Sequence, residues 1–397
     1  MSPSLTAVKI SDHVYWVGAI DWDARDFHGY SIERGTTYNA YLVMADKITL
    51  IDTVKRQFKD ELLARIASVV DPAKIDYIVS NHSEMDHSGC LPDVIQAVNP
   101  ERVFASALGV KNLSDHFAVS VPVTAVKDGE TLSLGNMTLS FTETRMMHWP
   151  DSMWSLLSED GVLFSNDAFG MHLASSERFA DKVDGWEHQA VKYYANIMMP
   201  LSNVVSRTMA KLSPTLSSIK IIAPDHGPIW RDDLSQILSL YAKWSSAKPT
   251  NKAVVVYDTM WGSTATMAHS IADGLMRGGA SVKLMSLKVS NRSDVVTELL
   301  NAGALVVGSS TLNGNLLPPM ADVLTYLKGL KPKGLIGAAF GSYGWSGESI
   351  GQVREYLTAI GVEMVKEDLR VKFVPGDADL EACHQLGLSI AEYLQDR

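Results

Sequence analysis

The chain has 397 residues, of which 46% are hydrophobic and 20% are charged, and its formal net charge is -10. This length predicts two or three domains, and the apolar content can supply a sizeable core for each. The negative charge argues against nucleic acid as a partner, because phosphate contacts need clustered Lys and Arg. No apolar stretch is long enough to cross a bilayer, so we expect no membrane association.

The chain contains only two cysteines, Cys90 and Cys383. Two cysteines exclude a disulfide framework, a Cys-ligated iron–sulfur cluster and a rubredoxin-type iron site within this chain. The first six residues show no basic region followed by an apolar run, so no signal peptide is predicted. We therefore expect a cytoplasmic protein whose thiols stay reduced.

The first part of the chain is predicted to be rich in strands, with helices between them. Residues 41–44 and 48–52 indicate a hairpin around a polar turn. Residues 58–70 have helical spacing, with leucine, isoleucine and valine on one face. Further short strands are predicted at 75–80, 102–105, 137–141, 161–164 and 219–222.

Four side chains able to bind a metal lie within six residues, directly after the predicted strand at 75–80: His82, Glu84, Asp86 and His87. His82 and Glu84 are two residues apart, so in extended backbone both can point to the same side. Asp86 and His87 follow at once and can serve a second ion beside the first. Imidazole and carboxylate ligands together suit iron or manganese as well as zinc.

A binuclear site needs more ligands, and three candidates lie further along in loop-like sequence: His148, Asp167 and His226. Asp167 and His226 directly follow predicted strands, and strand-end loops are where a rigid scaffold presents ligands. A single carboxylate such as that of Asp167 can bridge two cations.

The character of the sequence changes near residue 245. Residues 245–252 are polar, contain a proline and lack periodicity, so they indicate a linker. Beyond them strands and helices alternate, which predicts a doubly wound parallel sheet. We therefore predict one domain over 1–248 and another over 249–397. The predicted strands are 253–257, 281–286, 304–309, 335–340 and 370–373, and a helix over 378–394 closes the chain.

Three loops of the second domain, each after a strand, carry hydroxyls and glycines. Hydroxyls and free N–H groups at a helix N-terminus form a phosphate cradle, and loops after parallel strands meet at one edge of the sheet. The sequence lacks the G-x-x-x-x-G-K-[ST] motif, which argues against a nucleoside triphosphate as ligand. It also lacks G-x-G-x-x-G, which makes a dinucleotide a weaker candidate. The candidate binding residues are Thr259, Met260, Trp261, Gly262, Ser263, Thr264, Thr311, Leu312, Asn313, Gly314, Ser342, Tyr343, Gly344, Trp345, Ser346 and Gly347.

The two sets of motifs resemble known families. The first resembles the H-x-H-x-D-H motif of the metallo-β-lactamase fold, with Glu84 at the second position. The T-x-W-G-x-T loop is similar to the phosphate loop of flavodoxins. Taken together, over essentially the whole chain, they resemble the flavodiiron proteins. This resemblance implies a metallo-β-lactamase-like αββα domain with two iron ions, followed by a flavodoxin-like domain that binds FMN. A flavodoxin-like domain without cofactor, as in response regulators, is the alternative, but of their acidic cluster only Asp258 is present.

The resemblance also implies the ligand sets. One iron is expected on His82, Glu84 and His148 and the other on Asp86, His87 and His226, with Asp167 bridging. In some family members the position matching His87 does not bind its iron directly. A carboxylate at Glu84 is a harder, anionic ligand than imidazole, and it suits a redox-active iron pair better than a zinc pair.

Four further side chains are candidates for the surroundings of the irons: His28, His172, Tyr193 and Tyr194. The two histidines line the substrate pocket in one interpretation and are ordinary loop or core residues in the other. Of the two adjacent tyrosines, one is expected to face the metal site while the other packs. We expect Cys90, although it follows the metal motif, to be a small buried residue.

The resemblance predicts an oxidoreductase that reduces dioxygen to water, nitric oxide to nitrous oxide, or both, with electrons entering through FMN. It also implies a head-to-tail homodimer or a dimer of such dimers, and a rubredoxin or similar small redox protein as donor. One alternative is a metal-dependent hydrolase of the metallo-β-lactamase superfamily with a fused flavodoxin-like domain, against which Glu84 argues. The other is an electron carrier that uses the flavin alone, which leaves the metal ligands without a role.

Overall fold

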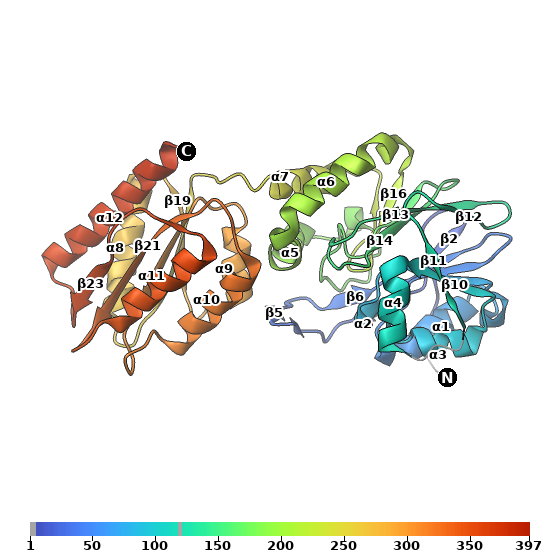
Figure 1. Cartoon of the computed structure of the whole chain (residues 1–397), viewed down its shortest axis with the longest axis horizontal. Coiled ribbons are helices and arrows are strands. Elements are labelled where there is room, and N and C mark those ends of the chain that lie inside the picture. The colour runs from blue at the N-terminus through green and yellow to red at the C-terminus, as the bar shows by residue number, and fades with distance from the viewer. Residues whose placement is uncertain (1–4, 118–120) are drawn as a thin grey trace. The chain divides into compact units, whose positions relative to one another are not determined.

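The computed structural model describes residues 5–117 and 121–397 and divides into two compact units (Figure 1). The first unit comprises Met1–His28, Ile32–Tyr193 and Asn203–Ala242, and the second comprises Gly29–Ser31, Tyr194–Ser202 and Lys243–Arg397. The division predicted after residue 248 falls close to the last of these changes and stays a prediction. Among the described residues, no helix has both the length and the apolar character needed to span a bilayer.

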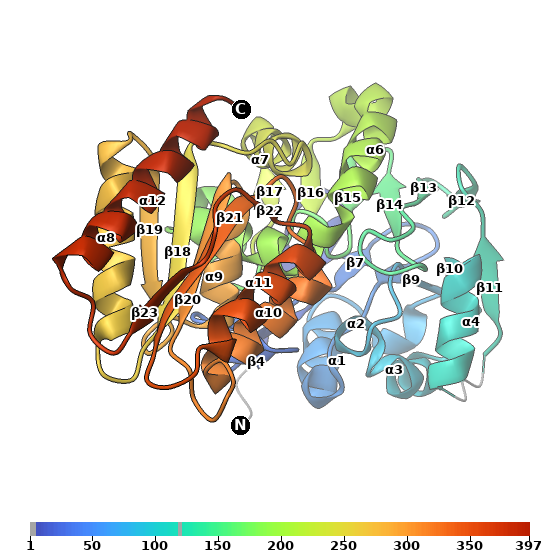
Figure 2. The ribbon, with the colours of Figure 1, turned by 60° about the vertical axis from the view of Figure 1, so that its left-hand side comes forward.

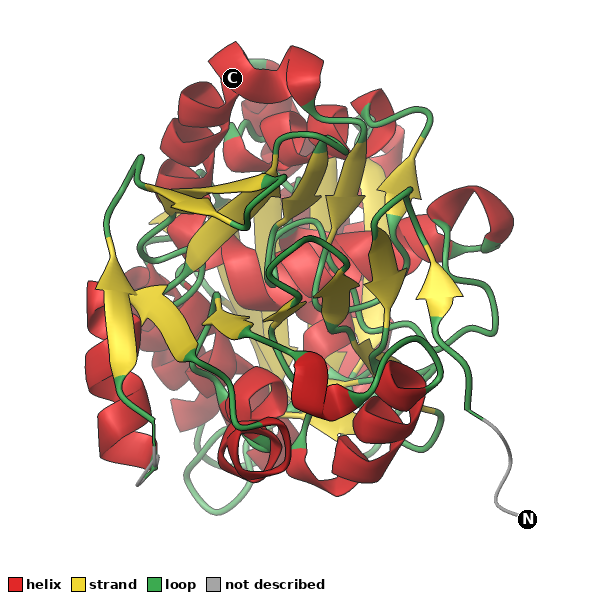
Figure 3. Ribbon diagram, turned by 90° about the vertical axis from the view of Figure 1, so that its right-hand side faces the viewer, coloured by secondary structure: helices red, strands yellow, loops and turns green. Residues whose placement is uncertain are grey.

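Two mixed sheets form the centre of the first unit (Figure 3). One has seven strands in the order β1 (Val8–Lys9), β2 (Val14–Trp16), β7 (Tyr41–Val43), β8 (Thr49–Ile51), β9 (Tyr77–Ser80), β10 (Arg102–Ser106) and β11 (Val123–Val126). The other has six, β12 (Thr131–Ser133), β13 (Thr138–Glu143), β14 (Met153–Leu157), β15 (Val162–Phe164), β16 (Ile221–Ala223) and β17 (Trp230–Arg231). Short strands β3 (Ala19–Asp21) and β6 (Thr36–Tyr38) form a separate pair.

The core of the first unit lies between the two sheets. Trp16, Tyr41 and Phe104 from the seven-stranded sheet are buried in one cluster with Phe141 and Phe164 from the six-stranded sheet. A second cluster fills the opposite face of the seven-stranded sheet, beneath α1 (Lys59–Ala67), α3 (Leu91–Val98) and α4 (Ala107–His116). The remaining helices of this region are α2 (Met85–Ser88), α5 (Trp186–Tyr193), α6 (Ser202–Leu212) and α7 (Ser235–Ser245).

Strand register in both sheets brings distant loops together. In the first sheet β8 runs parallel to β9 with Ile51 opposite Val79, so the residues that follow these two strands are neighbours. In the second sheet β15 runs parallel to β16 with Phe164 opposite Ala223. Because these strands end side by side, the loops that begin at residues 81, 165 and 224 have fixed starting points.

The second unit contains a parallel sheet in the order β19-β18-β20-β21-β22, with β23 paired to the far end of β21. Helices α8 and α12 cover one face, and α9, α10 and α11 lie on the other (Figure 2). The strands are β18 (Lys252–Asp258), β19 (Ser281–Ser286), β20 (Ala304–Ser309), β21 (Ile336–Tyr343), β22 (Glu363–Met364) and β23 (Leu369–Lys372). The helices are α8 (Ser263–Arg277), α9 (Arg292–Leu299), α10 (Pro318–Leu330), α11 (Glu348–Ile360) and α12 (Asp377–Gln395).

Two short segments from earlier in the sequence belong to this second unit. The hydroxyl of Ser31, in β5 (Tyr30–Ser31), lies 2.7 Å from that of Ser293 in α9. The Asn196 amide, in a π-helical turn at Tyr194–Met198, donates to the carbonyl of Ser293 at 3.2 Å. Such long-range contacts cannot be predicted from a linear division of the sequence.

Candidate metal centre and flavin cavity

The local backbone explains why four ligands fit into six residues. Glu84 is the N-cap of α2 and has extended dihedral angles, φ -61° and ψ 146°. His82 and Glu84 therefore precede the helix in extended chain, whereas Asp86 and His87 stand in its only turn. This change of conformation divides the four side chains into two pairs, as the sequence predicted.

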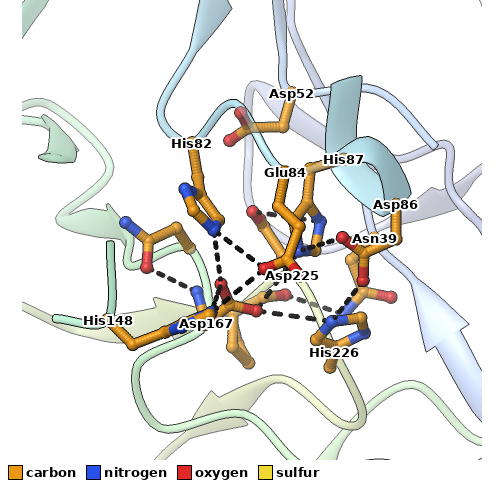
Figure 4. Close-up of polar contacts among 12 residues, drawn as sticks. Asn39, Asp52, His82, Glu84, Asp86, His87, His148, Asp167, Asp225 and His226 are labelled. Carbon is orange, nitrogen blue, oxygen red and sulfur yellow. Dashed lines mark hydrogen bonds and ion pairs between the residues drawn. The ribbon is translucent and has the colours of Figure 1, made fainter. Parts of the chain in front are cut away.

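His82, Glu84, His148 and Asp167 form the first pocket (Figure 4). Glu84 Oε2 lies 3.2 Å from Nε2 of both His82 and His148. Asp167 Oδ2 lies 3.4 Å from Nε2 of His82 and 3.2 Å from Nε2 of His148. The hydroxyl of Ser106, the N-cap of α4, donates to the carbonyl of Asp151 at 2.7 Å and so ties the loop that carries His148 to β10.

Asp86, His87 and His226 form the second pocket beside the first (Figure 4). Nε2 of His226 lies 3.2 Å from Asp86 Oδ2, and Nε2 of His87 lies 3.4 Å from Asp86 Oδ1. Asp167 Oδ1 completes the pocket, 3.2 Å from Nε2 of His87 and 3.3 Å from Nε2 of His226. Asp167 thus turns one oxygen to each pocket, which is the arrangement of a bridging carboxylate.

Both pockets fit a pair of cations. Asp86, His87, Asp167 and His226 are each at most 4% exposed. Both Asp86 oxygens, Nε2 of His87 and Oδ2 of Asp167 have no hydrogen-bond partner among the described residues. Buried polar atoms of this kind are costly unless something satisfies them. Four imidazoles and three carboxylates form a mixed nitrogen and oxygen donor set that suits iron.

In the metal-free chain, protons on the imidazoles offset the carboxylate charges. Burial lowers the pKa of His82, but the nearby carboxylates of Asp151 and Glu84 outweigh burial and raise that pKa to about 10. Burial likewise opposes a charge on His87, yet Asp86 and Asp167 raise its pKa well above the usual value. A bound cation would displace these protons, because it needs the neutral imidazole nitrogen.

Three buried aspartates behind the candidate ligands were not among the residues predicted from the sequence. Asp52 accepts hydrogen bonds from the backbone and side-chain amides of Asn81, at 2.7 and 2.8 Å, and so fixes the start of the ligand loop. Asp151 Oδ2 accepts from the Ser83 amide at 2.7 Å and lies 3.5 Å from Nδ1 of His82. Asp225 Oδ2 lies 3.6 Å from Nδ1 of His87. The available signals were the position of Asp225 directly before His226 and that of Asp151 three residues after His148.

The structure separates the four candidates for the surroundings of the metals. The Tyr193 hydroxyl donates to Asp167 Oδ1 at 3.0 Å. The ring of His172 lies 4.7 Å from that of His226, centroid to centroid, and its Nδ1 lies 2.8 Å from the Thr36 hydroxyl. His28 Nε2 lies 3.3 Å from Glu84 Oε1, although 75% of its side chain is exposed.

Tyr194 does not join this group. Its hydroxyl lies 3.2 Å from that of Ser202, and its ring packs 5.1 Å from that of Trp244. Of the two adjacent tyrosines, Tyr193 is therefore the one that meets the metal ligands, and Tyr194 is the one that packs. Cys90 is fully buried at the start of α3, as expected.

A cavity of about 380 Å³ lies at the carboxyl ends of the strands in the second unit, and all three predicted loops line it. The indole rings of Trp261 and Trp345, 94% and 91% exposed, stand among its lining residues. The predicted residues that line the cavity are Met260, Trp261, Ser263, Thr311, Asn313, Gly314, Ser342, Tyr343, Gly344, Trp345 and Ser346. Ser310, Phe373 and Val374 also line it and were not among the predicted residues.

Five predicted residues of the same loops are not among those that line the cavity: Thr259, Gly262, Thr264, Leu312 and Gly347. The Thr264 hydroxyl is buried and lies 2.9 Å from the hydroxyls of both Ser310 and Ser342, so it connects the three loops. Gly262, the N-cap of α8, has φ +95°, a conformation that favours glycine. The first turn of α8 contains no acidic residue, so the amides and hydroxyls at its N-terminus fit a phosphate group.

These features define a class: a binuclear centre on a metallo-β-lactamase-like fold, joined in one chain to a flavodoxin-like sheet. Residues 36–227 match the family described as ODP family beta lactamase, and residues 255–387 match flavodoxin. These matches and the sheet topologies confirm the predicted fold class.

Three relatives narrow the class. The nitric oxide reductase of Moorella thermoacetica is 45% identical, over 98% of this chain and 99% of that protein. The solved rubredoxin oxygen:oxidoreductase of Desulfovibrio gigas is 47% identical, with a TM-score of 0.96 over 98% of this chain and 99% of that one. The flavodiiron protein of Giardia intestinalis is 31% identical, with a TM-score of 0.94 over 100% and 98%. The chain belongs to the flavodiiron protein family.

Proposed function

We propose that this protein is a flavodiiron oxidoreductase that reduces dioxygen to water, nitric oxide to nitrous oxide, or both, with electrons supplied through FMN. The observation that carries the proposal is the pair of buried pockets that share Asp167, in a chain that also has a flavodoxin-like cavity. The Moorella relative is a nitric oxide reductase and the Desulfovibrio relative is a rubredoxin oxygen:oxidoreductase, which supports both gases as substrates.

The residues that would hold each cofactor follow from the site. His82, Glu84 and His148 would hold one iron, and Asp86, His87 and His226 the other, with Asp167 between them. The loops after β18, β20 and β21 would hold FMN. Bound FMN accepts electrons singly or in pairs and each iron changes its charge by one, so the two cofactors together supply what gas reduction needs.

Residues around the two pockets control protonation and the access of small molecules to the metal centre. Burial, together with the charge of Asp167, raises the pKa of Tyr193 well above its usual value, so its hydroxyl stays a donor to Asp167 Oδ1. Burial and the neighbouring His226 hold the pKa of His172 well below its usual value, which keeps that ring neutral. An open groove of about 690 Å³, lined by Phe27, His28 and Met85 among others, reaches Glu84 and gives a small diatomic molecule access.

The proposal also covers the electron donor, the oligomeric state and the cellular location of this protein. We propose a rubredoxin or similar small redox protein as donor, supported by the name of the Desulfovibrio relative. We also propose a head-to-tail homodimer, or a dimer of such dimers, and analytical ultracentrifugation would measure the number of chains in the assembly. The two cysteines are free and buried, which suits a reducing cytoplasm. Limited proteolysis between residues 245 and 252 would test the proposed division after residue 248.

Anaerobic stopped-flow spectroscopy of the reduced protein tests the activity. Mixing with dioxygen and, separately, with nitric oxide should reoxidise the flavin rapidly with at least one of the two gases, in protein that contains iron. A protein that held two zinc ions, cleaved esters and left both gases untouched would instead be a hydrolase, and the proposal would be abandoned.

A further inference from the structure

The imidazole of His87 lies among three carboxylates, two near its Nε2 and one near its Nδ1. Nε2 points into the second pocket, 3.4 Å from Asp86 Oδ1 and 3.2 Å from Asp167 Oδ1. Nδ1 points the opposite way, 3.6 Å from Asp225 Oδ2 (Figure 4). The ring can therefore present Nε2 to a cation only while Nδ1 faces Asp225.

The position of Asp225 is set by its backbone. Its amide donates to the carbonyl of Asn166 at 2.8 Å, and its carbonyl accepts from the amide of Asn39 at 2.7 Å. The side chain is fully buried, and neither carboxylate oxygen has a hydrogen-bond partner among the described residues. A buried carboxylate held in this way is costly unless it interacts with a nearby donor or cation, and the ring of His87 lies within reach of it.

The outer contacts of His226 and His82 differ from those of His87. Nδ1 of His226 donates to the carbonyl of Thr37 at 2.7 Å, a neutral acceptor. Asp151, which faces Nδ1 of His82, also accepts the Ser83 amide, so this carboxylate has a second use in the ligand loop. Asp52 is occupied by the two amides of Asn81. Asp225 has no comparable second use.

We propose that Asp225 is a positioning residue that holds His87 with its Nδ1 protonated and its Nε2 turned inward, and thereby makes His87 a direct ligand of the second metal ion. This inference rests on the proposed function, because it assumes that the second pocket holds iron. Carboxylate partners behind metal-bound histidines fix the ring orientation and make the ring a stronger ligand, and their loss costs about 10- to 100-fold in metal affinity.

A double-mutant cycle of D225N and H87A tests the inference, with Fe(II) binding to the apoprotein measured anaerobically by chelator competition. D225N keeps the shape and removes the charge, and should weaken one of the two sites by about 10- to 100-fold while the other stays unchanged. In the H87A background D225N should cause no further loss, because it acts through the missing ring. D151N is the matched control and should weaken the other site.

Equal loss from D225N in both backgrounds, equal loss at both sites, or no loss at all would overturn the inference. Far-ultraviolet circular dichroism of each apoprotein checks that the variant is folded. Wild-type protein that binds no iron would instead contradict the proposed function, so the two failures can be told apart.

A measurement on the unmodified chain covers the case in which D225N does not fold. In protein reconstituted with Co(II), ring N–H protons of ligating histidines give strongly shifted proton resonances. Selective ¹⁵N labelling of histidine should reveal such a resonance for each of His82, His87, His148 and His226, with that of His87 exchanging slowly with solvent. The absence of a shifted ring N–H resonance from His87 would overturn the inference.

Discussion

The two candidate cofactor sites are built in opposite ways. In the candidate metal centre, the chemistry resides in side chains. Seven candidate ligands converge there, and six of the seven residues are buried. The candidate flavin cavity is instead lined by three loops that carry hydroxyls and glycines, and two exposed tryptophans stand among its lining residues. The comparison teaches that the metal centre depends on particular side chains. The flavin cavity should tolerate more substitutions, because every non-proline residue supplies a backbone amide whatever its side chain.

The largest expected effect comes from Asp167→Ala. This variant removes the carboxylate that turns one oxygen to each pocket, so we expect both irons to be lost and gas reduction to fall to background. FMN content should be unchanged. Iron and flavin analysis measures both. Asp160→Ala, which removes a carboxylate that pairs with His13 and belongs to neither pocket, is the control and should retain both irons. Loss of FMN along with iron would break the comparison between the sites.

Glu84→His converts the motif to the zinc-hydrolase pattern. We expect gas reduction to be lost because imidazole replaces the anionic ligand that favours a redox-active iron, while the flavin remains bound. Turnover of dioxygen and nitric oxide by the purified variant is the measurement. Unchanged turnover with either gas would refute the role given to Glu84.

The pH should affect the metal centre more than the flavin cavity. The pKa of His82 is about 10 in the metal-free chain, and those of His87 and His148 are also raised, so these rings carry protons near neutral pH that iron must displace. Affinity for Fe(II) should therefore rise with pH up to those pKa values, about tenfold per unit for each proton released. Titration calorimetry in buffers of different ionisation enthalpy counts the protons. Affinity that stays constant from roughly pH 7 to 9 would contradict this account.

Thr264→Val tests the flavin cavity without changing the metal centre. The buried hydroxyl connects Ser310 and Ser342, and its loss should weaken FMN binding on the order of tenfold, equivalent to the loss of about one buried hydrogen bond. Iron content should not change. Thr266→Val is the matched control, because Thr266 is an exposed residue on the same helix. Flavin fluorescence titration of the apoproteins separates the two variants, and equal affinities would remove Thr264 from the account.

Tyr193→Phe should have the smallest effect. It removes one hydrogen bond to Asp167, so we expect both irons to be retained and gas reduction to slow by about fivefold. Tyr194→Phe is a control of identical chemistry one residue away, because its hydroxyl meets Ser202 instead. Steady-state rates with each gas compare the two variants, and equal rates would remove Tyr193 from the proposed function.

Sequence reasoning singled out residues whose side-chain type carries the proposed chemistry. His82, Glu84 and Asp86 are recognisable because few other roles need these side chains at this spacing, and the structure brings all seven predicted ligands together. The flavin loops were predictable because they follow parallel strands, which end at a common edge.

Sequence reasoning failed where a role arises from register. Asp225 faces His87 because β16 pairs with β15, and no spacing in the sequence reports that pairing. Phe373 and Val374 reach the flavin cavity because β23 pairs with the end of β21, where Tyr343 lies opposite Lys372. The predicted helix over 58–70 is shorter in the structure, where a 3₁₀ turn at Arg56–Phe58 precedes α1.

The most direct test of the central claim is a Mössbauer spectrum, with parallel metal and flavin analysis, of oxidised protein purified from cells grown on ⁵⁷Fe. If Asp167 joins two redox-active irons, the preparation should contain two irons and one FMN per chain, and the irons should be magnetically coupled to a diamagnetic ground state. Two uncoupled irons, a single iron, or zinc in both pockets would contradict it.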